Sequence, residues 1–332
     1  MTGFVRIDGE GVAARSAAHL LGAQQLPAVG ARPSLSAILL STATQSLLTD
    51  VFNDLHLFTG LHQIRRRIVA WGQNEPVELE HAAVVVSEQV LLDRLQSSGA
   101  AVEQTKWRIV ASKHQHPFPM EEQFGTRLAT ITPAQLNRNS PNDACWIESV
   151  QGGWLFLLAL GDTNASLISV GARPQSMLER SRLVAPHIVN LETGSVEVPA
   201  YPRIHSALCG PGWFACGSAA MSFDPVCGEG AGHAVREAIL ASAAVKALLR
   251  GEPEGPLLAH YSTRLTSAFL RHLETCYAFY SVARSGPWWD REIALLEQGI
   301  AWCRVGLANA PRYLYRLEGF ELVPLETTIP GT

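Results

Sequence analysis

Two stretches of the chain share one pattern: a short apolar run, then glycines, then a longer run of alanines and leucines at helical spacing. The later stretch spans residues 212 to 250, with an apolar run from Trp213 to Cys216 and glycines at 228, 230 and 232. This order predicts a strand, a glycine turn and a helix whose N-terminus offers unpaired N–H groups. We therefore expect it to bind an anion or an electron-rich ring. A strand-to-helix turn without a ligand is the alternative.

The earlier stretch, residues 3 to 22, predicts a strand from Phe4 to Ile7, a turn and an alanine-rich helix. Gly9, Gly11 and Ala14 have the GxGxxG/A spacing between that strand and that helix. The spacing suits a tight turn, close approach of the backbone to a pyrophosphate, and close packing of helix on strand. It predicts a dinucleotide site.

Two features of this turn depart from the pattern. Asp8 and Glu10 flank the first glycine, and carboxylates beside a pyrophosphate cost Coulomb energy unless they point away. The acidic residue expected on the ribose about 20 residues later is missing, because the second-strand candidate, residues 25 to 29, is followed by Gly30-Ala31-Arg32.

The remaining elements follow from periodicity and turn residues. Residues 153 to 171 form two apolar runs split by Gly161-Asp162-Thr163-Asn164, which predicts an antiparallel hairpin. The other expected segments are helices in 33–58, a strand in 63–72, a strand and helix in 81–95, a strand in 99–111, a loop-rich linker or lid in 112–143, a helix and polar strands in 174–205, and an aromatic-rich helical tail in 256–315. Aromatic side chains in such a tail are more often core than a cofactor site.

Composition narrows the class of protein. The 332 residues are 47% hydrophobic and 17% charged, with a net charge of −4, which describes a globular protein and gives no reason to expect nucleic acid. We see no apolar run of transmembrane length and no signal-peptide order, and expect a cytoplasmic protein without a membrane partner. The six cysteines show no CxxC pair and no Cys/His cluster at metal-ligand spacing, so we expect free thiols and no metal.

The two glycine stretches, separated by an antiparallel sheet, resemble the superfamily of FAD-dependent aromatic hydroxylases and flavin-dependent halogenases. That superfamily has a late GDAAxxxxPxxGxG segment, and this chain has Gly217-Ser218-Ala219-Ala220 and then Phe223 to Gly230. The family aspartate is Ser218 here. The resemblance implies FAD held at the early motif and at the late one. The cofactor-binding residues it implies are Gly9, Gly11, Ala14, Gly217, Ser218, Asp224, Pro225, Gly228 and Gly230.

The resemblance also implies the fold class: α/β, with a Rossmann-like FAD-binding domain, an inserted antiparallel-sheet substrate domain and a helical C-terminal tail. We assign residues 1–100 and 206–255 to the two parts of the FAD-binding domain, 101–205 to the substrate domain and 256–332 to the helical region. The short chain is similar to the compact flavoproteins that modify a protein partner during tryptophylquinone cofactor formation.

The activity implied is that of an FAD-dependent monooxygenase, in which a flavin C4a-hydroperoxide hydroxylates an aromatic small molecule or a tryptophan of a protein or peptide, with NAD(P)H as possible external reductant. Cys227 is a candidate for contact with the flavin face, with a buried structural thiol as the commoner reading. His62 is a candidate catalytic base, as are His81 and His233, although a lone histidine is more often structural.

Halogenation is disfavoured. Halogenases of the superfamily carry a WxWxIP segment and a lysine, whereas residues 154–159 here hold one tryptophan and no Ile-Pro. The lysines, Lys106, Lys113 and Lys246, are not near residues 62–67, which match the position of the family's lysine.

Two other functions stay open. Asp8, Glu10 and Ser218 at cofactor positions also fit a degenerate flavoprotein fold that serves as a binding or maturation subunit with weak or no FAD binding. An NAD-dependent dehydrogenase explains the early motif but leaves the late glycine segment without a role.

Overall fold

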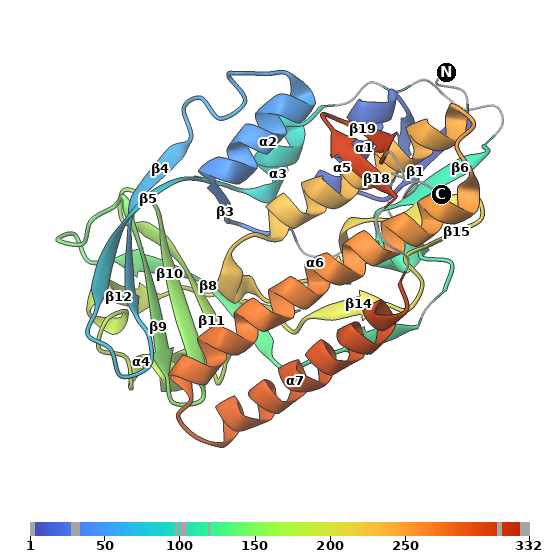
Figure 1. Ribbon diagram of the computed structural model, residues 1–332. Coiled ribbons are helices and arrows are strands. Elements are labelled where there is room, and N and C mark those ends of the chain that lie inside the picture. The colour runs from blue at the N-terminus through green and yellow to red at the C-terminus, as the bar shows by residue number, and fades with distance from the viewer. Residues whose placement is uncertain are drawn as a thin grey trace.

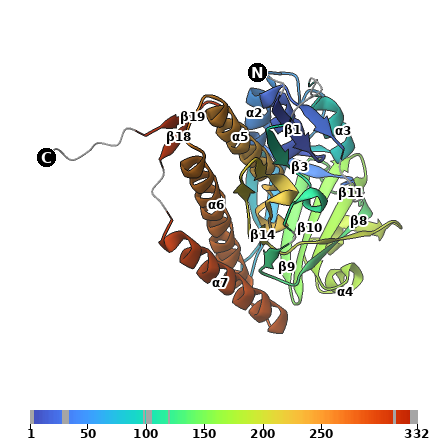
Figure 2. The ribbon, with the colours of Figure 1, turned by 90° about the vertical axis from the view of Figure 1, so that its right-hand side faces the viewer.

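The computed structural model describes residues 4–27, 34–96, 99, 105–118, 120–310 and 314–325. Its described strands form sheets of five, nine, three and two strands. The five-stranded and nine-stranded sheets lie toward opposite ends of the molecule, and two long helices, α6 (Glu254–Ala283) and α7 (Pro287–Ala308), run past both (Figure 1). Figure 2 shows these two helices side by side along one flank. The architecture is α/β with a helical C-terminal region, as expected.

The five-stranded sheet has the order β15-β16-β6-β1-β2. Its parallel strands are β1 (Val5–Asp8), β2 (Gln24–Leu26), β6 (Trp107–Val110) and β16 (Trp213–Ala215), and β15 (Cys209–Gly210) is antiparallel to β16. Helices α1 (Val12–Leu21) and α5 (Gly230–Leu249) are rich in alanine, and their buried small side chains let them pack closely together and against the sheet. Both expected strand–turn–helix units are therefore present in this sheet.

The nine-stranded sheet is mostly antiparallel, with the order β12-β8-β11-β10-β9-β4-β5-β3 and β13 also paired with β8. Its strands are β3 (Ile38–Ser41), β4 (His62–Ala70), β5 (Val77–Val86), β8 (Leu128–Leu136), β9 (Ala144–Val150), β10 (Gly153–Gly161), β11 (Asn164–Gly171), β12 (Ile188–Leu191) and β13 (Val196–Pro199). The predicted hairpin is confirmed as β10–β11, whose turn holds Asp162 at a φ of 49°. Strands β4 and β9 are parallel.

Smaller elements complete the fold. The shorter helices are α2 (Thr42–Phe52), α3 (Glu88–Arg94) and α4 (Pro174–Leu178). Helix α2 contacts β3 and β5, and α4 contacts β10 and β11. A three-stranded sheet joins β7 (Glu121–Gln123), β14 (Arg203–His205) and β17 (Met221–Ser222), and the strands β18 (Tyr315–Glu318) and β19 (Glu321–Pro324) form a hairpin after α7. Short 3-10 turns occur at 113–115, 185–187, 217–219 and 225–227. Within the described residues, no helix combines the length and apolarity needed to cross a bilayer.

One expectation about local structure was wrong, and a second was incomplete. Residues 112–143, expected to be a linker or lid, include β7 and β8, and β8 has partners on both sides in the large sheet. Its small and polar residues hide the alternation by which a strand is recognised. Segment 33–58, expected to hold one or two helices, contains α2 but also β3, because a short apolar run does not distinguish strand from helix.

The predicted domain boundaries differ from the membership of the sheets. Strands β3, β4 and β5 fall within 1–100 yet lie in the nine-stranded sheet, whereas β6 falls within 101–205 yet pairs with β1 in the parallel sheet. The chain therefore passes between the two sheets more often than the four predicted domain segments imply. Of the predicted strands at 25–29 and 99–111, residues 28–29 and 100–104 lie outside the described residues.

An aromatic layer joins the nine-stranded sheet to α6 and α7. Trp71, Trp154, Tyr280 and Trp289 contact one another, with ring centroids 5.1 to 6.4 Å apart. The indole N–H of Trp154 donates to Tyr280 Oη at 3.1 Å. Trp289 and Tyr280 are fully buried, as expected for core residues of the aromatic tail, whereas Phe279 and Trp302 of the same tail are exposed.

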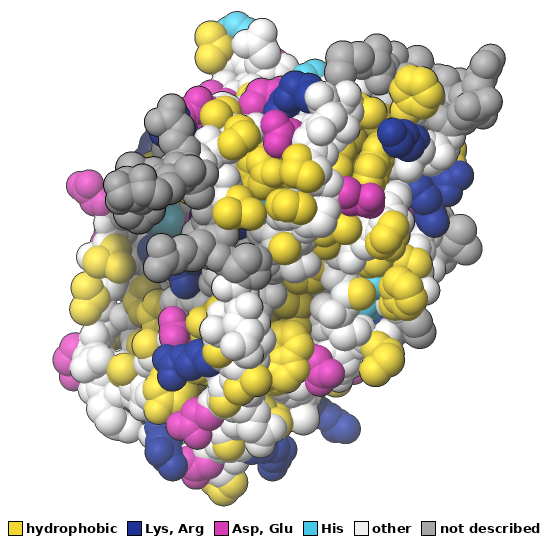
Figure 3. Space-filling view, turned by 45° about the vertical axis from the view of Figure 1, so that its right-hand side comes forward, with side chains coloured by type: hydrophobic (Ala, Val, Ile, Leu, Met, Phe, Trp, Pro, Cys, Tyr) yellow, Lys and Arg dark blue, Asp and Glu magenta, His cyan; other side chains and the backbone are white. Residues whose placement is uncertain are grey.

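Figure 3 shows one outer face, where hydrophobic side chains gather near the centre and Lys and Arg side chains lie toward the margins.

Candidate functional site

The turn between β1 and α1 has backbone conformations that require glycine. Gly9 and Gly11 have φ values of 129° and 96°, which side chains rarely adopt. A Cβ added to Gly9 would lie 2.8 Å from the backbone nitrogen of Ser112. Gly11 is the N-cap residue of α1, and no side chain caps this helix, whereas Ala14 is fully buried one turn later. The first N–H groups of α1 are thus available to a ligand.

Asp8, which precedes the first glycine of this turn, is paired with two arginines. Its side chain is buried and takes hydrogen bonds from Arg108 at 2.6 and 2.8 Å, and Arg6 Nε lies 2.8 Å from its other oxygen. The two guanidinium groups compensate the charge of the Asp8 carboxylate. The repulsion expected between this carboxylate and a neighbouring pyrophosphate is therefore reduced. Glu10, by contrast, is exposed.

A cavity of about 460 Å³ opens beside the turn, lined by Glu10, Gly11, Arg15 and Gln25 among others. Arg15 Nε and Gln25 Oε1 are buried, and neither has a hydrogen-bond partner among the described residues. The other polar atom of this amide, Gln25 Nε2, has a partner, because it donates a hydrogen bond to Gly9 O at 2.9 Å. Arg15 and Gln25, each with one buried polar atom that lacks a partner, thus line a cavity next to a helix N-terminus, a setting that suits the phosphates and ribose of a dinucleotide.

The two glycine segments meet. Gly217, with a φ of 55°, begins the turn η4 (Gly217–Ala219), and a Cβ added to it would lie 2.8 Å from Ala13 Cβ in α1. Its N–H donates to Glu237 Oε2 of α5 at 2.7 Å. Ser218 is exposed, and its hydroxyl donates to Ala111 O at 3.2 Å, so this hydroxyl already has a partner within the protein.

Asp224 lies inside the protein with its carboxylate enclosed. It accepts hydrogen bonds from Arg127 Nε at 2.6 Å, Tyr280 Oη at 2.8 Å and the N–H of Val226 at 2.8 Å. The last bond caps the short turn η5 (Pro225–Cys227). In this arrangement Asp224 positions the following segment.

That segment leads into α5 with open space around its glycines. Gly228 has a φ of 66°, and a Cβ added to Gly228 or Gly230 would have no neighbouring atom within 4 Å. Helix α5 begins at Gly230, as predicted, and has no capping side chain. Pro225 is the first residue of η5, and its ring fixes the backbone φ at that position. The segment thus presents backbone groups to open space at the positive end of a helix.

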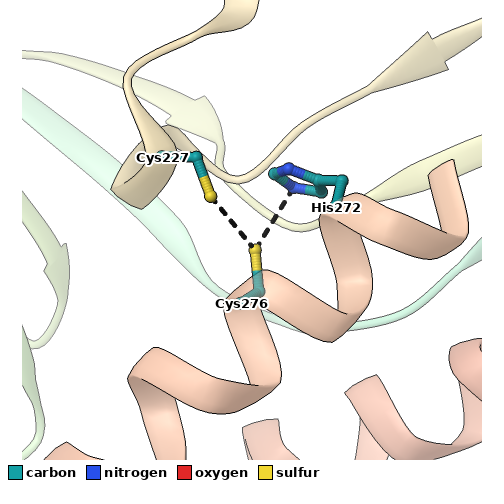
Figure 4. A group of neighbouring side chains, drawn as sticks. All are labelled: Cys227, His272 and Cys276. Atoms are coloured by element: carbon teal, nitrogen blue, oxygen red, sulfur yellow. Dashed lines mark hydrogen bonds between the residues drawn. The ribbon is translucent and has the colours of Figure 1, made fainter. Parts of the chain in front are cut away.

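Cys227 lies next to two residues of α6. Its Sγ is 3.8 Å from Cys276 Sγ, and Cys276 Sγ is 3.3 Å from His272 Nε2 (Figure 4). The ligand-capable atoms of the three residues all lie within 4.8 Å of one another. Hydrogen bonding from Cys276 lowers the pKa of the Cys227 thiol to about 6, and burial holds the pKa of Cys276 well above its usual range.

A groove of about 890 Å³ runs between α5, α6 and the β18–β19 hairpin and reaches Cys227 and His272. Its described lining includes arginines from several elements and no lysine. The charged and histidine side chains are Arg67, Glu229, His233, Arg236, Glu237, His260, Arg264, Arg271, His272 and Arg316.

The predicted histidines lie apart. His62 is on a shallow pocket of about 420 Å³ with Asn142, and its Nε2 is 2.7 Å from Asn142 O, while Cys227 lies on the groove. His81 Nε2 is 2.9 Å from Arg67 Nη2. His233 lies on the groove and stacks on Phe223 at 4.0 Å, and burial lowers its pKa to about 4, which makes it a weak base. The structure does not bring His62 and Cys227 into one site.

The sequence analysis missed four residues that shape the site: Arg127, Glu237, His272 and Cys276. For the last two a signal was present, since positions four apart on a helix share a face. Arg127 and Glu237 gave no signal, because their partners lie elsewhere in the chain: Asp224 for Arg127 and Gly217 for Glu237.

This fold is shared with flavin-dependent monooxygenases and halogenases, as the late glycine segment led us to expect. QhpG, a peptidyl tryptophan dihydroxylase essential for tryptophylquinone cofactor biogenesis, is 18% identical with a TM-score of 0.72, over 88% of this chain and 79% of that one. The myxobacterial chondrochloren halogenase CndH is 16% identical with a TM-score of 0.72, over 94% of this chain and 91% of that one.

PqsL, a probable FAD-dependent monooxygenase from Pseudomonas aeruginosa, is 16% identical with a TM-score of 0.66, over 90% of this chain and 100% of that one. At such identities the likeness establishes the fold. No protein-family model and no curated protein matched the sequence.

Replacing Arg127 by methionine should destabilise the protein strongly. The change leaves the carboxylates of Asp224 and Glu292 buried without their cation, which typically costs about 3–5 kcal/mol. Urea unfolding measures the loss, and Arg304→Met, which breaks an exposed pair with Glu274, should cost at most about 1 kcal/mol. Similar losses in the two variants would contradict the assignment.

The stability of the protein should fall between pH 4.5 and 8 because of Glu237. Burial raises the pKa of this carboxyl from 4.5 to about 8, so in this range the folded state holds a proton that the unfolded state has lost. Glu237→Gln keeps an acceptor for Gly217 N–H and should raise stability at pH 8.5 by on the order of 5 kcal/mol, with little change at pH 5.

Thermal unfolding from pH 5 to pH 9 tests this, with Glu274→Gln as the matched control at an exposed carboxyl. If Glu237→Gln and wild type keep parallel profiles, the buried carboxyl is not the source of the pH dependence.

Proposed function

We propose that this protein is an FAD-dependent oxidoreductase that hydroxylates an aromatic ring, either of a small molecule or of a residue in a protein or peptide. The observation that carries the proposal is the meeting of the two glycine segments, each opening a helix without a capping side chain, beside a cavity with unsatisfied polar atoms. The shared fold supports it.

The chain offers groups for each part of the cofactor. The N–H groups at the start of α1 and the guanidinium of Arg15 would hold the pyrophosphate. Gln25, near the end of β2, lies where the family's acidic residue is expected, and its free Oε1 can accept a hydrogen bond from a ribose hydroxyl. This amide therefore substitutes for the missing carboxylate.

The late segment would contact the flavin ring. Residues Pro225 to Gly228 would line the ring, and the N-terminus of α5 would stabilise negative charge on its edge. FAD, when bound, supplies the reaction with oxygen and the transfer of an oxygen atom to the substrate. The protein's own part is orientation and exclusion of water.

The groove would admit the substrate, since it reaches Val226 and Cys227. Arg236 and Arg271 on its wall favour a substrate that carries a negative group beside its ring. NAD(P)H is the proposed external reductant. Halogenation stays disfavoured, because the described lining of the groove contains no lysine.

A binding or maturation subunit with weak FAD affinity is the second candidate. The exposed carboxylate of Glu10 lines the cavity, and the Ser218 hydroxyl is already bonded to Ala111 O. Both features weaken cofactor binding relative to the family pattern.

Binding of FAD decides between the two candidates. We expect the purified protein to show flavin absorbance, or to gain it and a higher Tm when FAD is added. Arg15→Ala should raise the Kd for FAD by roughly tenfold, about 1.4 kcal/mol, as measured by flavin fluorescence. Arg304→Ala, on the exposed surface, should leave it unchanged. A colourless protein whose Tm ignores FAD would favour the binding subunit.

If FAD binds, NAD(P)H consumption and product mass with aromatic and tryptophan-containing peptide substrates test the reaction. The expected product carries one or more added oxygen atoms. Reduction of the bound flavin without any oxygenated product would restrict the assignment to an oxidase or reductase.

A further inference from the structure

Cys227 and Cys276 form a pair of thiols of which one lines the groove and the other is buried behind it. Cys227 ends η5, is half-buried and lines the groove, whereas Cys276 lies within α6 and is fully buried. Their Sγ atoms are 3.8 Å apart and point toward each other, as Figure 4 shows. A small oxidant in the groove can therefore reach one sulfur, and the second sulfur lies directly behind it.

The shifts in the pKa values of the two thiols fit an attacking sulfur on the groove and a second sulfur behind it. The Cys276 thiol hydrogen-bonds Cys227 and is the largest influence that lowers the pKa of Cys227, while burial keeps Cys276 protonated. The two pKa values are thus shifted in opposite directions, and the sulfur on the groove loses its proton more readily than the sulfur behind it. The thiolate is the form that attacks peroxides and disulfides.

The position of His272 argues against a metal site at this cluster. The backbone N–H of Asp224 donates to His272 Nε2 at 2.9 Å. The nitrogen nearest the sulfurs thus uses its lone pair for a buried hydrogen bond, and a metal ion would have to break that bond to gain a third ligand. Two sulfurs remain, and two sulfurs in contact are sufficient for a disulfide.

We propose that Cys227 and Cys276 form a redox-active dithiol that hydrogen peroxide or an organic hydroperoxide oxidises to a disulfide. The thiolate of Cys227 attacks an oxygen of hydrogen peroxide, the O–O bond breaks, and a sulfenic acid and hydroxide form. Cys276 Sγ then attacks Cys227 Sγ, the S–S bond forms, the S–O bond breaks, and the hydroxyl leaves with the Cys276 proton as water. Two thiols lose two electrons, and peroxide is reduced to water.

The bond requires a small movement that the segment permits. The sulfurs must approach from 3.8 Å to about 2.05 Å. Cys227 is followed by Gly228, and space lies open around both Gly228 and Gly230, so η5 can shift toward α6. The disulfide would then fix the Pro225–Gly228 segment to α6. This inference goes beyond the proposed function and does not depend on FAD.

The experiment uses the reduced full-length protein without added FAD. It is treated with hydrogen peroxide, its remaining thiols are alkylated in denaturant, and it is analysed by intact mass and peptide mapping. We expect loss of two hydrogens, a cross-link between the peptides of Cys227 and Cys276, four alkylated cysteines, and reversal by dithiothreitol. Alkylation of all six cysteines after peroxide, or oxidation spread over unrelated cysteines, would overturn the proposal.

Two variants sharpen the test. In Cys276→Ser the sulfenic acid on Cys227 has no thiol to attack it, so dimedone should label Cys227. Cys303→Ser removes a buried thiol whose pKa burial raises to about 12, and should form the disulfide at the wild-type rate. In wild type, iodoacetamide should modify Cys227 at least about tenfold faster than Cys303.

Equal labelling of Cys227 by dimedone in wild type and in Cys276→Ser would show that Cys276 does not resolve the sulfenic acid, which contradicts the proposal. Stoichiometric Co²⁺ binding with a thiolate charge-transfer band that disappears in Cys276→Ser would also overturn it, in favour of a metal site. Thermal unfolding of each variant checks that it is folded, and the wild-type cross-link is decisive by itself.

Discussion

Arg127 is the side chain on which the arrangement of the site depends most. It lies just before β8, is fully buried, and binds Asp224 at 2.6 Å and Glu292 of α7 at 2.5 Å. Its guanidinium also lies over the ring of Tyr280 in α6, 4.8 Å from the centroid. A buried guanidinium is tolerated only when its charge is compensated, and here the two compensating carboxylates come from different parts of the chain. One cation therefore sets the positions of the large sheet, the segment before α5 and the C-terminal helices together.

The aromatic layer also holds the large sheet against the C-terminal helices, in this case by packing. Trp154 connects the large sheet to Tyr280 through a hydrogen bond, and the same tyrosine hydroxyl donates to Asp224. The chain of contacts runs from a strand, through α6, to the residue that caps η5. Because each polar atom in it is buried and bonded, a shift of any member would leave a neighbour unsatisfied. The start of η5 is thus anchored at Asp224, whereas its end at Cys227 is followed by glycines with open space around them.

Features that depend on neighbouring residues in the chain could be predicted from the sequence. Features that depend on a partner far away in the chain could not. Gly9, Gly11 and Gly217 require backbone conformations or close approaches that a side chain would prevent, and these could be inferred from spacing. The hairpin at Asp162 followed from its turn residues. The roles of Asp224 and Glu237 could not be predicted, because they depend on an arginine about a hundred residues away and on a glycine in another turn. The composition of β8 also concealed a strand that only its neighbours in the sheet define.

The order of strands in the parallel sheet has a consequence for synthesis. Its adjacent strands β1, β6 and β16 come from residues 5–8, 107–110 and 213–215, and Gly217 packs against Ala13. A ribosome delivers the first of these strands long before the last, so the N-terminal turn must wait for about a hundred further residues for β6 and for about two hundred for Gly217. At a few residues per second that wait lasts on the order of ten seconds or more. The residues that line the cavity beside this turn all come before residue 100, so its walls are synthesised well before β16, the last strand to join this sheet.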